Sequence, residues 1–120
     1  PHAAIDKRAA FAAQGVRTIA GVSEDHVDLA EALGALQREL GLTSLLCEPG
    51  PRLLGALLQQ NLVDELWWFT APALLGDDAR AAAPALGIEA MSQVLRLASS
   101  TSVRNAGADA LFVGPLALRD

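Results

Sequence analysis

The side chains that could do nucleophilic, acid–base or metal chemistry are scarce in this sequence. Its 120 residues include one Cys, two His and no Tyr. A single thiol, Cys47, cannot form an internal disulfide or a cysteine-rich zinc site, which excludes a disulfide-stapled secreted fold. Neither His2 nor His26 stands in an H-x-E or H-E-x-x-H pattern, and P-C-x-x-C is absent, so a zinc-dependent nucleobase deaminase is excluded as well. The sequence predicts no metal site.

Charge and hydropathy exclude further classes of protein. Nine basic and fourteen acidic residues give a net charge of -5 and a pI of about 4.8, which is the wrong sign for a protein that binds a phosphate backbone. Lys7 does not follow a G-x-x-x-x-G run, so no P-loop is present. The longest apolar stretch, Leu66 to Leu75, is far shorter than the roughly 20 residues of a membrane-spanning helix. We therefore expect a cytoplasmic protein that binds neither nucleic acid nor membrane.

The most informative local chemistry lies in the turn Glu48-Pro49-Gly50-Pro51. The turn follows an apolar run, Thr43–Cys47, that is typical of a central strand, and it precedes a helix that Pro51 would open. A turn between a strand end and a helix N-terminus presents unpaired backbone N–H groups, and open α/β sheets bind phosphates at that position. The alternative is a plain strand-to-helix turn.

Other residue types that could do chemistry have simpler interpretations. Cys47 ends an apolar run with no His beside it, so we expect a buried structural thiol. Trp67 and Trp68 could stack on a ring, but neighbours on a strand face opposite ways, so at least one is expected to pack in the core or at a dimer interface. The same alternation separates Asp64 from Glu65 and disfavours a paired-carboxylate site.

Hydrophobic periodicity and turn signals predict alternating helices and strands. The predicted helices are Ala3–Ala13, Leu29–Leu40 with Asp28 as N-cap and Gly41 as stop, and one from Pro51 to Asn61; the predicted strands are Val16–Val22, Thr43–Cys47, Asp64–Thr70, Val94–Val103 and Ala108–Val113. This order indicates one α/β domain over residues 1–120. Its sheet is expected to be parallel in the centre and to end in an antiparallel hairpin, with helices on its faces.

Four segments together resemble one known family. They are Glu48-Pro49-Gly50-Pro51, then Asn61 to Leu66 (N-L-V-D-E-L), Ala71 to Gly76 (A-P-A-L-L-G) and Gly107 to Phe112 (G-A-D-A-L-F). From about Ala12 to its end, the sequence is similar to the C-terminal reductase domain of the bifunctional riboflavin-biosynthesis deaminase/reductase, a relative of dihydrofolate reductase. Pro49 stands where the family pattern E-G-G-P has its first Gly.

The resemblance implies an activity and a set of site residues. The activity is NADPH-dependent reduction of the ribose of 5-amino-6-(5-phosphoribosylamino)uracil to a ribitylamino product, on a homodimer. Glu48 would contact the substrate, and the cofactor loop would consist of Pro49, Gly50, Pro51, Arg52 and Leu53. No catalytic residue is identified, because the resemblance covers only the C-terminal part of the reductase domain. The alternative is a non-catalytic α/β module that binds a nucleotide or dimerises.

Overall fold

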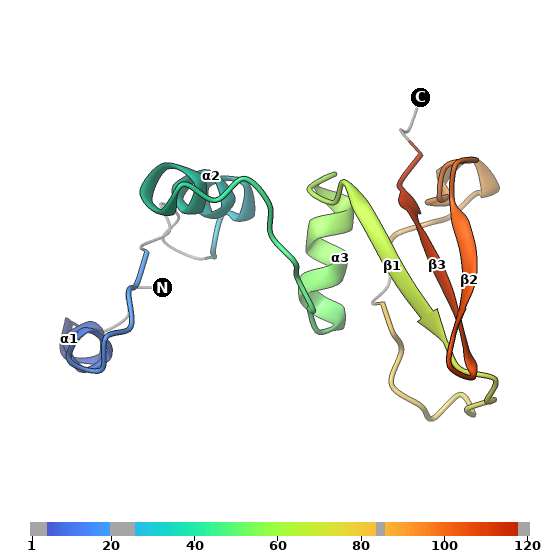
Figure 1. Cartoon of the computed structure of the whole chain (residues 1–120), viewed down its shortest axis with the longest axis horizontal. Coiled ribbons are helices and arrows are strands. Elements are labelled where there is room, and N and C mark those ends of the chain that lie inside the picture. The colour runs from blue at the N-terminus through green and yellow to red at the C-terminus, as the bar shows by residue number, and fades with distance from the viewer. Residues whose placement is uncertain (1–4, 20–25, 84–85, 118–120) are drawn as a thin grey trace. The chain divides into compact units, whose positions relative to one another are not determined.

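The computed structural model describes residues 5–19, 26–83 and 86–117 (Figure 1). The chain forms two compact units, Pro1–Cys47 and Glu48–Asp120. Within the described residues, no helix has the length and apolar character needed to cross a membrane. The prediction of one domain over residues 1–120 stays a prediction.

The first unit contains helices α1 (Ile5–Ala13) and α2 (Leu29–Leu40). Both confirm predicted helices. The Asp28 side chain accepts a hydrogen bond from the Glu31 backbone N–H at 3.0 Å and so caps the start of α2. Gly41 ends α2 in the left-handed conformation, with φ 67°, where a side chain would be strained. The N-cap and the C-terminal Gly thus fix both ends of α2.

The predicted strand Val16–Val22 is not formed where the structure describes it. Residues 16–19 are irregular, and residues 20–22 lie outside the described ranges. Arg17 in this segment pairs with Glu39 of α2 at 3.2 Å. An exposed ion pair therefore connects residues 16–19 to α2, and these residues pair with no strand in the described part of the unit.

The second unit places a helix beside a three-stranded sheet (Figure 1). Its elements are α3 (Pro51–Gln59), β1 (Glu65–Thr70), the short 3₁₀ helix η1 (Met91–Gln93), β2 (Ser102–Ala106) and β3 (Asp109–Pro115). The strand order is β1-β3-β2, and both pairs are antiparallel. A two-residue turn that starts at Gly107, with φ 66°, joins β2 to β3. The predicted C-terminal hairpin is confirmed.

The end of α3 fixes how the chain enters β1. Asn61 adopts a positive φ of 54°, and the Leu62 backbone N–H donates to the Leu57 carbonyl at 2.9 Å. This is the hydrogen-bond pattern of a Schellman ending, in which a left-handed residue reverses the chain direction. Among the described residues of this unit, the buried hydrophobic side chains are Leu57 and Leu58 on α3 and Leu111 on β3.

The predicted parallel centre of the sheet is not confirmed. Residues 43–47 form no strand, and Leu45 and Leu46 are 55% and 82% exposed. A parallel strand is stable only when neighbouring strands pair with it and layers cover both of its faces. No described strand pairs with this run. For the same reason the prediction that Cys47 is buried is wrong, and its thiol is exposed.

The prediction of a long strand over Val94–Val103 is also wrong. A single bridge joins Leu97 to Leu116, and β2 begins only at Ser102. The Thr101 side chain donates to the Ala98 carbonyl at 2.6 Å, and the Thr101 backbone N–H donates to the same oxygen at 3.0 Å. These two hydrogen bonds turn the chain between Ala98 and Thr101 and interrupt the strand.

Candidate functional site

The first turn of α3 leaves backbone donors without partners inside the helix. Gly50 is the N-cap and makes no side-chain cap hydrogen bond, and Pro51 follows at the first helical position. The first helical hydrogen bond at this end runs from the Leu54 N–H to the Gly50 carbonyl at 3.0 Å. The N–H groups of Arg52 and Leu53 therefore have no intrahelical acceptor. A free helix N-terminus of this kind favours an anion.

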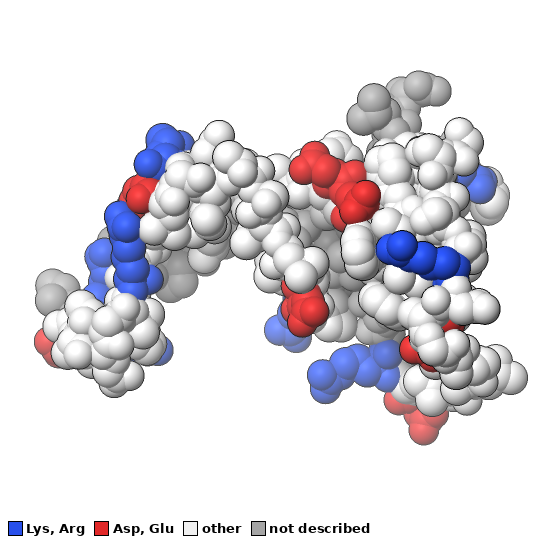
Figure 2. Space-filling view, in the orientation of Figure 1, with Lys and Arg blue, Asp and Glu red and all other residues white. Residues whose placement is uncertain are grey.

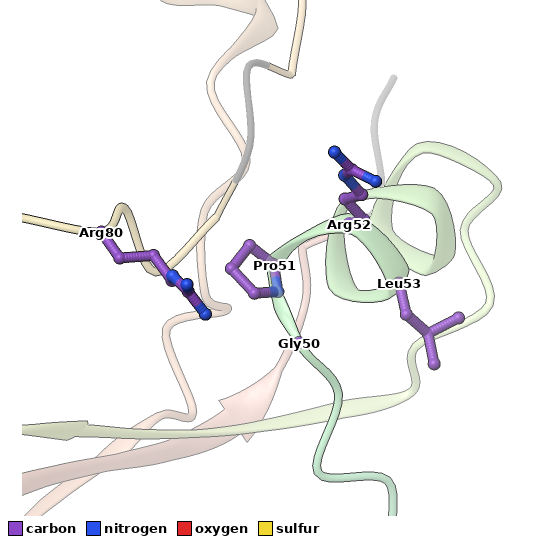
Figure 3. A pocket seen from close by; sticks show the side chains of 5 residues that line it. All are labelled: Gly50, Pro51, Arg52, Leu53 and Arg80. Carbon is purple, nitrogen blue, oxygen red and sulfur yellow. The ribbon is translucent and has the colours of Figure 1, made fainter.

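A cavity of about 590 Å³ opens against this turn. Its lining residues are Gly50, Pro51, Arg52 and Leu53 from the start of α3, together with Arg80 from the segment between β1 and η1 (Figure 3). In Figure 3 the guanidinium of Arg80 points toward Pro51, whereas that of Arg52 points away from Pro51. The volume is in the range of small-ligand sites, which is about 300 to 1,000 Å³.

Both arginines at this cavity are free to bind an anion. The ion pairs formed by the described residues are Arg17 with Glu39 and Arg38 with Glu31, and neither pair includes Arg52 or Arg80. Over the second unit, on the right of Figure 2, basic side chains stand apart from one another and among acidic ones. The positive charge at the cavity is therefore local, and it suits a small phosphorylated ligand better than an extended polyanion.

The sequence-predicted site residues are brought together only in part. Gly50, Pro51, Arg52 and Leu53 line one cavity, whereas Glu48 and Pro49 do not line it. Glu48 lies in irregular, exposed chain just before Gly50. Arg80 was not predicted from the sequence. In the sequence, Arg80 is a basic residue that follows Asp77 and Asp78 in a segment without hydrophobic periodicity. Neither feature indicates how far Arg80 lies from α3.

The aromatic strand presents a second group of polar contacts. Trp67 is 51% exposed and Trp68 is half-buried, which confirms that the two rings face opposite ways. The Trp67 indole N–H donates to Glu65 at 2.5 Å, and the guanidinium of Arg104 lies 5.5 Å from the centre of the Trp67 ring. These contacts fix Trp67 on the exposed face of the sheet, and neither tryptophan lines the cavity.

The described residues contain no group of three or more His, Cys, Asp or Glu side chains that could hold a metal ion. What they do contain is a cavity lined by a helix N-terminus with free N–H groups and by two arginines that form no ion pair with another described residue. The start of α3, beside the antiparallel sheet, therefore has the backbone donors and the positive charge that favour an anionic ligand.

Comparison with known families makes the assignment specific. Residues 3–110 match the model of the RibD C-terminal domain. This range covers most of the chain and includes α1, α2, α3 and the lining of the cavity. The chain belongs to the RibD C-terminal domain family. The resemblance predicted from the four sequence segments is therefore confirmed.

Curated relatives carry the same family name. The chain is 38% identical over 84 residues to the riboflavin biosynthesis protein RibD of Escherichia coli (strain K12), a match that covers 70% of this chain and 22% of that protein. It is 49% identical over 51 residues to the RibD of Haemophilus influenzae, which covers 40% of this chain and 14% of the relative. The chain thus spans about a fifth or less of the length of these relatives.

Solved structures agree with this assignment. Two solved structures of Acinetobacter baumannii RibD, form 2 and form 1, superpose on this chain with a TM-score of 0.79 each, at 30% and 29% sequence identity. In each case the match covers 92% of this chain and 29% of the other. The chain therefore has an α/β fold similar to part of the RibD structure, with a small antiparallel sheet and helices.

Proposed function

We propose that this chain is the cofactor-binding part of a reductase in riboflavin biosynthesis. The proposed reaction is the NADPH-dependent reduction of the ribose of 5-amino-6-(5-phosphoribosylamino)uracil to a ribitylamino chain. Membership of the RibD C-terminal domain family supports this role, as do the names of the E. coli and H. influenzae relatives. The observation that carries the proposal is the cavity at the start of α3, with its free backbone donors and unpaired arginines.

The residues at the cavity fit the phosphates of a dinucleotide. The N–H groups of Arg52 and Leu53 can donate to pyrophosphate oxygens, and the Arg52 guanidinium can add a charge-assisted hydrogen bond. Gly50 has no side chain, so a phosphate can approach its backbone closely. The space beside Gly50 is open, because a Cβ built on this residue has no neighbouring atom within 4 Å. The described residues thus offer both donors and room.

The chemistry would be divided between the cofactor and the chain. When bound, NADPH supplies the hydride that reduces the sugar. The start of α3 holds the dinucleotide by its phosphates and fixes its position relative to the substrate. Glu48, two residues before Gly50, accepts hydrogen bonds from sugar hydroxyls and so orients the ribose. This division explains how a chain so poor in reactive side chains can serve a redox reaction.

The finer fold assignment is part of the same proposal. A dihydrofolate-reductase-like sheet has a parallel centre, and the apolar run Thr43–Cys47, helix α3 and strand β1 follow one another in the order of a βαβ unit. A parallel crossover needs about a dozen residues or more, and the stretch from Glu48 to Asp64 is long enough. Homodimerisation through the aromatic strand and cytoplasmic localisation also stay predictions.

The proposed reaction can be tested on the full product of the gene that encodes this sequence. The purified protein is incubated with NADPH and the phosphoribosylaminouracil substrate, and the product is analysed by mass spectrometry. We expect a product that has gained two hydrogen atoms, formed in step with NADPH oxidation, and a large loss of activity in the Arg52→Ala variant. NADPH binding without any reduced product would contradict the proposed reaction.

One observation favours a second candidate function. Pro49 removes a backbone N–H next to the cavity and restricts the turn, and both effects weaken a phosphate site. A non-catalytic nucleotide-binding or dimerisation module would tolerate such a loss more easily than an enzyme would. Nucleotide binding in the full gene product without turnover would support this second candidate.

A further inference from the structure

Arg80 is the cavity residue that comes from a different part of the chain. Gly50 to Leu53 belong to the start of α3, whereas Arg80 lies in the segment between β1 and η1. Its guanidinium points across the cavity toward Pro51, and it does not share the direction of Arg52 (Figure 3). The cavity therefore has two separate cationic groups, each on its own wall.

The acidic neighbours of Arg80 do not neutralise it at the cavity. Asp77 and Asp78 precede it but do not line the cavity. The Asp78 carboxylate folds back over its own turn, since a Cβ built on Gly76 would lie 2.7 Å from its Oδ1. The turn is closed by a hydrogen bond from the Ala79 N–H to the Gly76 carbonyl at 3.1 Å. Arg80 thus makes no ion pair with another described residue.

Two separate cations match the two anionic centres of NADPH. One centre is the pyrophosphate, and the other is the phosphate monoester on the 2′-oxygen of the adenosine ribose, which NADH lacks. In the dinucleotide sites of doubly-wound folds, an acidic side chain binds the 2′-hydroxyl of NAD, whereas a nearby arginine accommodates the 2′-phosphate of NADP; the same chemistry applies to an arginine at any dinucleotide site. A guanidinium can bind such a dianionic monoester through two parallel hydrogen bonds.

We propose that Arg80 binds the 2′-phosphate of NADPH and thereby sets the preference of this site for NADPH over NADH. The inference rests on the proposed function, because it takes the pyrophosphate to lie at the start of α3 beside Arg52. Arg80 is then a specificity-determining residue, and neither Asp77 nor Asp78 lines the cavity beside it.

The test compares the affinities of NADPH and NADH by calorimetry at one fixed ionic strength. In the Arg80→Ala variant, we expect NADPH to bind about tenfold or more weakly while the affinity for NADH changes less than about twofold. Arg80→Lys keeps the charge but loses the bidentate geometry, so it should restore part of the preference. Arg96→Ala is the matched control, since Arg96 is an exposed arginine that does not line the cavity.

The outcomes separate this inference from the proposed function. If wild-type protein binds NADPH and NADH equally well, or if Arg80→Ala weakens both to the same extent or neither, the inference is overturned and the proposed function stands. If wild-type protein binds neither dinucleotide, both fail. Because Arg80 is exposed, we expect the variants to have the circular dichroism spectrum of the wild-type protein, and a changed spectrum of Arg80→Ala would overturn its use as evidence for a phosphate contact.

Discussion

Pro49 is the residue at which this loop differs most from the pattern of its family. A proline has no backbone N–H and holds φ near about -65°, so the turn loses one donor next to the cavity. The donors that remain belong to Arg52 and Leu53, in the first turn of α3. The proposed phosphate site therefore depends on the first turn of α3 more than on the loop before it.

Restoring glycine at position 49 should strengthen cofactor binding. In Pro49→Gly the turn regains a backbone N–H that can donate to a phosphate oxygen, and we expect NADPH to bind about three- to tenfold more tightly. Calorimetry with NADPH measures the change, and Pro72→Gly serves as the control because Pro72 does not line the cavity. Unchanged or weaker binding would count against this account of the loop.

Individual residues differ in how far the sequence could identify them. Residues 49–53 are contiguous, so the sequence predicts them as one group, and four of them, Gly50 to Leu53, line the cavity whereas Pro49 does not. Arg80 was missed because its proximity to α3 depends on the path of an irregular segment between β1 and η1. Glu48 remains a prediction, since it does not line the cavity.

Among the elements, those defined by local interactions were the easiest to predict. Helix α2 has a capping Asp28 and a terminating Gly41, and α3 has Pro51 at its start. The hairpin of β2 and β3 needs only a two-residue turn. The strand predicted over Thr43–Cys47 depends on partner strands far away in sequence, and the one over Val94–Val103 was interrupted by a side-chain turn. Composition and periodicity reveal neither effect.

A close approach between β3 and the chain before β2 should be sensitive to one added methyl group. Gly114 on β3 is buried, and a Cβ built there would lie 2.8 Å from the Thr101 backbone Cα. The backbone of Thr101 is held by its hydrogen bonds to Ala98. We expect Gly114→Ala to lower the free energy of unfolding by about 1 to 3 kcal/mol.

Urea unfolding followed by tryptophan fluorescence measures this loss, because both tryptophans lie on β1, which pairs with β3. The reference is the wild-type protein, and equal stability of Gly114→Ala and the wild type would show that the contact between Gly114 and Thr101 is not tight in solution.

At the scale of the whole molecule, the sheet exposes aromatic surface on one face. Trp67 and Phe69 on β1 are 51% and 56% exposed, and Glu65 and Arg104 lie on the same face by strand alternation and register. In a two-fold symmetric dimer this face would pack against the same face of the second subunit. Glu65 of one subunit could then pair with Arg104 of the other around the aromatic side chains. This face is the surface on which the predicted homodimer can be tested.

We expect Phe69→Arg to shift the protein from dimer toward monomer in sedimentation velocity, because it places like charges opposite each other in the interface. The matched control is Val103→Arg, since Val103 is 62% exposed and lies on the opposite face. A monomeric wild-type protein, or equal effects of the two variants, would exclude this face as the dimer interface.

The central claim is that the cavity at the start of α3 binds the phosphates of NADPH. Its most direct test is a calorimetric titration of NADPH into wild-type protein, Arg52→Ala and the control Arg104→Ala, at low and at moderate salt. The account predicts saturable binding that weakens with salt, is reduced about tenfold or more by Arg52→Ala, and is unchanged by Arg104→Ala. Absence of saturable binding to wild-type protein, or equal affinities for wild-type and Arg52→Ala, would contradict it.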